Sequence, residues 1–281
     1  MKNSHRTYRT GFGDLSFEIE CNNEDAYSIA KFLFLDFPDS TTITLTKQYD
    51  IVSSGPIPML SLWDGDKQLY FGKSRYQLAY ILMNEMIYYC INTNSTQHAL
   101  HAGAVFKDDQ CIILPGKSGN GKSTLTAWLT ANGYQYLTDE LIFLSSAGRV
   151  SPLTRPVNLK LDASYISWLF KEGGVDDQVI ADEKGSMIPH RLLNPEFSLQ
   201  QPQVTHILFP EYRDGAELSL EKISPAKSCL YLIPSHVNAR NLSGHGIAEL
   251  SSIIRKCSSY KFVYGSFNDL ETIFNSSTPF S

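Results

Sequence analysis

The chain has 281 residues, of which 42% are hydrophobic and 19% are charged, so it can bury a core and its composition excludes an intrinsically disordered protein. Its formal net charge of −5 argues against a general nucleic-acid or membrane-surface binder, so any phosphate binding must come from a local site. The five cysteines include no C-x-x-C pair, which favours reduced thiols over a zinc site or a disulfide framework. No apolar segment follows the polar N-terminus, and the most apolar helical stretch, 76–91, is too short for a bilayer, so we expect a cytoplasmic protein with no membrane partner.

Residues 1–95 are predicted to form a smaller N-terminal α+β module. Its predicted elements are a half-buried strand over 15–20, a helix over 25–34, a strand over 41–45, a hairpin of 56–62 and 68–71, and an amphipathic helix over 75–91. The polar stretch 92–97 is predicted to be a linker, and residues 96–281 are predicted to form the second domain.

The second domain is predicted to mix strands and helices. Strands are expected at 102–106, 111–114, 134–137, 141–144, 204–209 and 218–220, and helices at 123–132, 163–170, 225–232, 246–258 and 269–274. The polar, glycine-containing stretch 172–189 is predicted to be a mobile loop. The fold class expected for the chain is α/β, with a mixed α+β character.

One stretch carries the strongest functional signal: Gly116-Lys117-Ser118-Gly119-Asn120-Gly121-Lys122-Ser123, followed by Thr124, fits the P-loop pattern G-x-x-x-x-G-K-[ST]. A predicted strand precedes it and a predicted helix follows it, which is the context that the pattern requires. Glycines let successive backbone N–H groups surround an anion, and the helix N-terminus adds partial positive charge. Lys122 is then expected to reach the β- and γ-phosphates of a nucleotide, and the Ser123 hydroxyl to ligate Mg²⁺.

Two acids and a histidine near this stretch could complete a catalytic site. Asp139 and Glu140 follow a predicted strand, sixteen positions after Ser123 (139 minus 123). One carboxylate could hold Mg²⁺ and the other could accept a proton from an incoming hydroxyl. Adjacent residues of a regular strand point to opposite faces, so both acids can serve one site only if the chain bends there. His101 begins the strand before the P-loop strand and could contact a phosphoryl oxygen or orient a carboxylate.

Several cations further along the chain are weaker candidates. Arg155 and Lys160 could stabilise transition-state charge or anchor a substrate, and a plain surface strand explains them equally well. Lys184, His190 and Arg191 border the predicted loop and could close on a substrate, although a solvated loop is the simpler explanation.

Three segments together resemble the HPr kinase/phosphorylase family, and most of all its branch of HPr kinase-related kinases, which are found near small peptide-binding chaperones. They are Leu100-His101-Ala102-Gly103-Ala104-Val105, Leu114-Pro115 with the P-loop through Thr124, and Gly133-Tyr134-Gln135-Tyr136-Leu137-Thr138-Asp139-Glu140. Arg155-Pro156-Val157-Asn158-Leu159-Lys160, Lys184-Gly185 and Tyr264-Gly265 look like that branch too. The resemblance covers residues 98–275.

The resemblance implies a P-loop kinase core related to phosphoenolpyruvate carboxykinase, and ATP-dependent phosphorylation of a protein serine. It places Asp139 as the catalytic acid/base, Glu140 as the metal-linked acid and His101 beside the phosphates. The chain departs from the family in having Asp-Glu in place of Asp-Asp, and residues 1–95 match no family domain. The segment used for phosphorolysis is not found either.

The sequence therefore predicts a kinase that uses ATP and Mg²⁺ to phosphorylate a hydroxyl, expected to be a serine, of a peptide or small protein encoded nearby. The catalytic residues would be Asp139, His101, Lys122 and Arg155. A small-metabolite kinase and a nucleotide-gated binding protein with little turnover stay open as alternatives. The N-terminal module and the loop 172–191 are expected to recognise the peptide, unless the module covers a sheet edge or makes a homo-oligomer contact.

Overall fold

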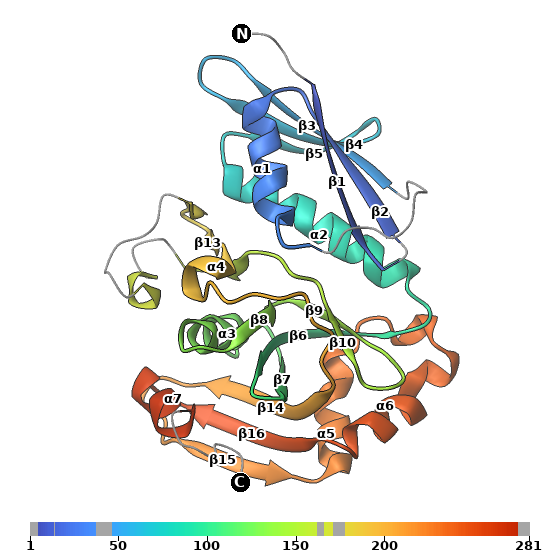
Figure 1. Ribbon diagram of the computed structural model, residues 1–281, viewed down its shortest axis with the longest axis vertical. Helices are drawn as coiled ribbons and strands as arrows, with labels where there is room; N and C mark the ends of the chain where they lie inside the picture. Colours follow the sequence, from blue (N-terminus) through green and yellow to red (C-terminus); the bar gives the residue numbers. More distant parts are fainter. Residues whose placement is uncertain (1–4, 14, 38–46, 162–165, 171–177, 275–281) are drawn as a thin grey trace. The chain divides into compact units, whose positions relative to one another are not determined.

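The computed structural model describes residues 5–13, 15–37, 47–161, 166–170 and 178–274 (Figure 1). The chain folds as two compact units, and each is described by itself. Unit 1 consists of Met1–Thr93, Thr130–Asn132 and Leu153–Leu199, and unit 2 of Asn94–Leu129, Gly133–Pro152 and Gln200–Ser281. The first boundary between the units falls after Thr93, two residues before the end of the predicted module at residue 95. The segment Leu153–Leu199, however, belongs to unit 1, so the predicted second domain, 96–281, is divided between the units.

Unit 1 contains a five-stranded sheet in the order β1-β2-β3-β4-β5. Its strands are β1 (Arg6–Phe12), β2 (Leu15–Cys21), β3 (Lys47–Ser54), β4 (Met59–Asp64) and β5 (Lys67–Gly72). Only the pairing of β2 with β3 is parallel. The predicted strand at 15–20 and the predicted hairpin around Gly65 are confirmed, whereas β1 and β3 were not predicted and 41–45 lies outside the described residues.

Two helices cover one face of this sheet. α1 (Glu24–Phe34) packs on β1, β2 and β3, α2 (Arg75–Thr93) packs on β4 and β5, and the helices contact each other. α1 begins where the side chain of Asn23 accepts a hydrogen bond from the backbone N–H of Ala26, which satisfies a donor that the first turn leaves open. Both helices are among the predicted elements, α2 on the basis of its apolar spacing.

A second, three-stranded sheet of unit 1 comes from the segment after residue 153, in the order β11-β13-β12. Its strands are β11 (Val157–Leu159), β12 (Ile180–Asp182) and β13 (Gly185–Ile188), and α4 (His190–Leu193) follows. The Tyr76 hydroxyl of α2 donates to Asn158 Oδ1 at 2.9 Å, which ties β11 to the helix. The stretch 172–189, predicted to be a loop, therefore contains a hairpin, while its part 171–177 lies outside the described residues. Of the predicted helix 163–170, the described part holds the 3₁₀ turn η2 (Ser167–Leu169).

Unit 2 is built on an eight-stranded mixed sheet in the order β10-β9-β6-β7-β14-β16-β15, with β8 also paired to β6. Its strands are β6 (His98–Lys107), β7 (Gln110–Pro115), β8 (Gln135–Thr138), β9 (Leu141–Leu144), β10 (Val150–Pro152), β14 (Val204–Tyr212), β15 (Ser219–Ile223) and β16 (Ser258–Tyr264). β7, β14 and β16 run parallel, so their carboxyl ends lie at the same edge of the sheet.

Helices complete unit 2. They are α3 (Lys122–Ala131), α5 (Pro225–Leu232), α6 (Ile247–Ile254) and α7 (Phe267–Phe274), together with the short turns η3 (Ile233–Ser235), η4 (Ala239–Asn241) and η5 (Ser243–Gly246). Leu232 of α5 and Leu250 of α6 are buried in one core with Ile113 of β7. The predicted helix 246–258 ends earlier, at Ile254, and the chain then enters β16, which was not predicted because most of this strand is buried and shows no alternation.

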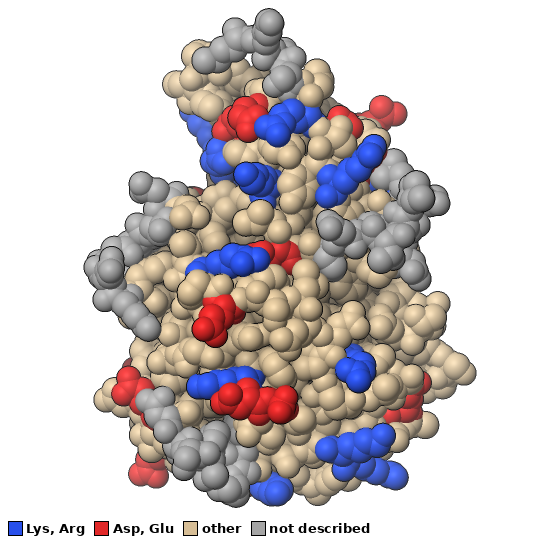
Figure 2. All heavy atoms as spheres, viewed as in Figure 1, with Lys and Arg blue, Asp and Glu red and all other residues tan. Residues whose placement is uncertain are grey.

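Charged side chains are dispersed over the face drawn in Figure 2, where lysine and arginine lie among aspartate and glutamate instead of gathering into a broad basic surface. Within the described ranges, no helix combines the length and the apolar character needed to cross a bilayer.

Candidate functional site

The glycine-rich loop lies between the end of β7 and the start of α3, as its motif requires. Gly119 and Gly121 have φ values of 90° and 82°, in the left-handed region where a side chain is strained. Lys122 is the first residue of α3, and its side-chain ammonium donates a hydrogen bond to the Lys117 carbonyl at 3.0 Å. Lys122 is only 6% exposed, so its charge is held against the backbone of the loop.

Two tyrosines from neighbouring strands support the loop from behind. The backbone N–H of Tyr212, at the end of β14, donates to the Asn120 carbonyl at 3.3 Å, and the Tyr264 hydroxyl, at the end of β16, donates to the Gly121 carbonyl at 3.4 Å. A Cβ at Gly121 would lie 2.5 Å from the Tyr264 hydroxyl oxygen. The loop therefore sits at the carboxyl ends of the parallel strands, which is where α/β sheets place ligands.

The two acids occupy a break between strands. β8 and β9 pair one after the other with the same edge of β6, and Asp139 and Glu140 fall between them. The chain bends at both positions, as a shared site for the two carboxylates requires.

The pairing of β6 brings this break next to the loop. On one edge of β6, the backbone N–H of Ala102 donates to the Glu140 carbonyl at 3.1 Å. On the other edge, Ala102 is the register partner of Pro115, the last residue before Gly116. The break and the start of the loop thus flank the same residue of one strand.

Asp139 is buried, with 1% of its surface exposed. The Tyr136 hydroxyl donates a hydrogen bond to Asp139 Oδ1 at 3.1 Å, which fixes the orientation of the carboxylate. Sequence reasoning missed Tyr136. Its spacing three residues before Asp139 gave no signal, because residues of opposite parity on a regular strand face opposite sides and only the bend brings the two side chains together.

Glu140 and His101 form a pair that is open to solvent. His101 Nε2 lies 3.3 Å from Glu140 Oε1, and the two side chains are 35% and 31% exposed. The predicted neighbourhood of His101 and the acids is therefore present in the structure. The histidine can orient the carboxylate or, when protonated, offset its charge.

Close packing of α3 on β6 holds the loop and the break together. A Cβ added at Gly103 of β6 would collide with the Thr126 hydroxyl of α3, so the helix approaches this strand more closely than any other residue type would allow. The first turn of α3, which carries Lys122 and Ser123, is thereby anchored to the strand that bears His101.

The remaining sequence candidates belong to unit 1. Arg155, His190 and Arg191 line a single cavity there, whereas Lys160 is exposed just after β11. Lys184 lies in the turn between β12 and β13 and donates to Gln77 Oε1 at 3.3 Å. Three of these five candidates, Arg155, His190 and Arg191, therefore line one cavity, and Lys160 and Lys184 do not.

The donors available near the loop suit a metal that arrives with a nucleotide. Lys122 and the backbone N–H groups could hold phosphates, while the Ser123 hydroxyl and the carboxylates of Asp139 and Glu140 offer oxygen ligands. In the part of the chain that the structure describes, no three His, Cys, Asp or Glu side chains are grouped as a metal site. Mg²⁺ usually takes one or two carboxylates together with waters and substrate phosphates, so this donor set is compatible with it.

Comparisons with known proteins do not show a family for this chain. No protein-family model and no curated protein matches the chain. Among solved structures, the chain is similar to the HPr(Ser) kinase/phosphatase from Coxiella burnetii, at 14% sequence identity and a TM-score of 0.31. That similarity covers 63% of this chain and 93% of the other, and it is too slight to establish a family.

Proposed function

We propose that the chain is an ATP- and Mg²⁺-dependent kinase that transfers the γ-phosphoryl group to a hydroxyl of a peptide or protein, with serine as the expected acceptor. One observation carries the proposal: the β8–β9 break, with Asp139 and Glu140, and the start of the glycine-rich loop flank the same residue, Ala102 of β6. A phosphate-binding loop and a pair of carboxylates at one strand end are the parts that phosphoryl transfer needs.

The loop supplies nucleotide binding in this proposal. Its backbone N–H groups and the N-terminus of α3 face the phosphates, and Lys122 leaves the Lys117 carbonyl to contact the β- and γ-phosphate oxygens. When bound, Mg²⁺ would neutralise charge on those oxygens, held by the Ser123 hydroxyl and by Glu140 directly or through water. Tyr264 and Tyr212 support the loop through their hydrogen bonds to the Gly121 and Asn120 carbonyls.

Asp139 is the proposed base. Its carboxylate accepts the proton of the acceptor hydroxyl while the hydroxyl oxygen bonds to the γ-phosphorus and the bond to the β,γ-bridging oxygen breaks. ADP leaves with that electron pair, so atoms and charge balance. The Tyr136 hydrogen bond keeps Asp139 oriented before the acceptor arrives. His101 positions Glu140 through their contact at 3.3 Å.

The choice of a peptide hydroxyl follows the sequence resemblance to protein-serine kinases, since the site geometry alone fits any hydroxyl. A small-alcohol kinase would use the same residues. The two differ in the acceptor that turns over, so the acceptor has to be measured.

The test compares Asp139→Asn with Asp109→Asn, a control in the turn at the opposite end of β6, where asparagine tolerates the positive φ of 62°. Each protein is incubated with ATP, Mg²⁺ and serine peptides or small alcohols, and products are identified by mass spectrometry. Asp139→Asn should lower transfer at least about a hundredfold, as expected for loss of a general base, with ATP affinity kept in calorimetry. Near-normal transfer by Asp139→Asn, or absence of ATP binding by the unmodified chain, would show that the proposal is wrong.

A further inference from the structure

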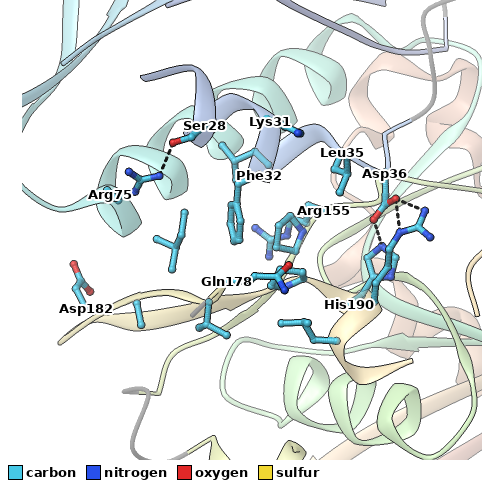
Figure 3. Close-up of a pocket in the computed structure, with 18 of the residues that line it drawn as sticks. Ser28, Lys31, Phe32, Leu35, Asp36, Arg75, Arg155, Gln178, Asp182 and His190 are labelled. Atoms are coloured by element: carbon cyan, nitrogen blue, oxygen red, sulfur yellow. Dashed lines mark hydrogen bonds and ion pairs between the residues drawn. The ribbon is translucent and has the colours of Figure 1, made fainter. Parts of the chain in front are cut away.

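Unit 1 contains a cavity of about 830 Å³ that no part of the proposed kinase reaction uses. One wall is the face of α1 around Phe32, another is β12, and the segment around Arg155 and the start of α4 close it (Figure 3). Phe32 and Gln178 project into it from different elements, as Figure 3 shows. Its volume suits several residues of a peptide or a drug-sized molecule.

The acids that line the cavity are already engaged. Asp36 accepts from Arg191 at 2.8 Å and lies 2.8 Å from His190 Nε2. Asp182 accepts from the Ser74 hydroxyl at 2.5 Å, and Glu24 forms an ion pair with Arg6. The charges of Asp36 and Glu24 are offset by Arg191 and Arg6, whereas Asp182 is held by hydrogen bonds from uncharged donors.

Of the cations on the lining, Arg75 and Arg191 form ion pairs with Asp25 and Asp36. Lys31 and Lys73 are exposed on the rim, and neither forms an ion pair with any described residue. Arg155 is buried, with 2% exposed, and its guanidinium keeps its charge at every physiological pH. The lining carries five lysines or arginines and three acids, so its formal charge is positive and favours an anionic group.

A buried hydroxyl adds a second, independent sign of a ligand. Thr154 lines the cavity and is 1% exposed, yet its Oγ1 has no hydrogen-bond partner among the described residues. Leaving such a group unsatisfied costs about 1–3 kcal/mol, so a ligand that offers it a polar partner would recover that cost.

The shape of the cavity indicates an extended chain. Among the described strands β12 pairs with β13 alone, so no described strand occupies its other edge, which is called the open edge below. Ile180, Ala181 and Asp182 all line the cavity, although consecutive residues of a strand face opposite sides, so the cavity runs along that open edge. An extended peptide can pair with such an edge through its backbone.

We propose that this cavity binds an extended peptide segment that carries an anionic side chain. The backbone of the peptide pairs with the open edge of β12, and its anionic group lies between Lys31 and Lys73. Its apolar neighbours pack on Phe32, and a polar group meets the Thr154 hydroxyl. The inference concerns binding only and does not depend on phosphoryl transfer.

The experiment measures binding of three degenerate peptide libraries to the full chain without nucleotide, with a central glutamate, phosphoserine or lysine. The double variant Lys31→Glu/Lys73→Glu should bind the preferred anionic peptides at least about tenfold more weakly. Lys67→Glu, an exposed control on β5 away from the cavity, should leave affinity unchanged. Thr154→Val should weaken binding a few-fold without lowering stability, because it removes an unsatisfied hydroxyl.

Each arm has an outcome that overturns the proposal. Equal binding of the lysine and anionic libraries would remove the charge argument. An equal loss of affinity in Lys67→Glu would show that the loss reflects the overall charge of the protein and not the lysines of the cavity. Unchanged binding after alternate peptide nitrogens are methylated removes the pairing with β12. The glutamate and phosphoserine arms identify which anion is preferred. Peptide binding that persists in Asp139→Asn, while this variant no longer transfers phosphate, separates this site from the kinase proposal.

Discussion

Replacing Gly121 by alanine should destabilise unit 2 more than the same change at Gly119, although both glycines have positive φ. At Gly119 an added Cβ meets nothing within 4 Å, so the cost is backbone strain alone, about 1 kcal/mol. At Gly121 the Cβ would lie 2.5 Å from the Tyr264 hydroxyl oxygen and 3.1 Å from Tyr212 Cβ. Overpacking of that kind adds about 1–3 kcal/mol, which gives a total of about 2–4 kcal/mol.

Tyr264→Phe separates the two contributions, because it removes the oxygen that the new Cβ would meet. Alone it should cost about 1 kcal/mol, since it loses the hydrogen bond to the Gly121 carbonyl. In the Tyr264→Phe background the excess cost of Gly121→Ala over Gly119→Ala should fall by about 1 kcal/mol or more.

The assay is urea unfolding of the single variants and the two double variants, with ATP affinity measured alongside by calorimetry. Equal costs for Gly119→Ala and Gly121→Ala in both backgrounds would refute the reasoning, because it would show that the tyrosine does not support the loop. Gly121→Ala should also weaken ATP binding, since the loop must move away from Tyr264.

Three further predictions concern Lys122, Glu140 and Asp36. Lys122→Ala should lower ATP affinity and phosphoryl transfer at least about tenfold while the unfolding midpoint changes little, and unchanged affinity in calorimetry would contradict the nucleotide site. Glu140→Gln should raise the Mg²⁺ concentration needed for half-maximal transfer several-fold, because the metal loses a ligand or an outer-shell acceptor, and an unaltered Mg²⁺ titration would remove its metal role. Burial raises the pKa of Asp36, but hydrogen bonds from His190 and Arg191 outweigh it and hold this pKa at about 2. Because the folded pKa is lower than the unfolded one, this carboxylate stabilises the fold above pH 4 by about 2 kcal/mol and loses that contribution as the pH falls toward 2. Asp36→Asn should flatten acid unfolding over that range, and an identical profile would show that Asp36 is not the group responsible.

The local sequence was enough to predict the elements with strong local patterns. The apolar spacing of residues 75–91 predicted the helix α2. The G-x-x-x-x-G-K-[ST] motif predicted the strand, loop and helix around Gly116, because its own glycines set the geometry of the loop. The bend at Asp139 and Glu140 could be stated as a requirement before the structure was known, because the parity of strand residues demands it.

The structure alone decided how distant segments pair. That the segment after residue 153 joins unit 1 depends on contacts such as Tyr76 with Asn158, which are 82 positions apart and leave no periodic signal. The cavity likewise combines Phe32 with Arg155 from separate stretches.

The sequence by itself determined which residues could bind a phosphate and accept a proton, because those properties belong to side-chain chemistry and local backbone freedom. Only the tertiary structure decided that they meet. The register of β6 brings Asp139 and Glu140 beside the glycine-rich loop, and the open edge of β12 exists because no other described strand pairs with it. Strand register is fixed by burial and by hydrogen bonds between segments far apart in the chain, which no local pattern specifies.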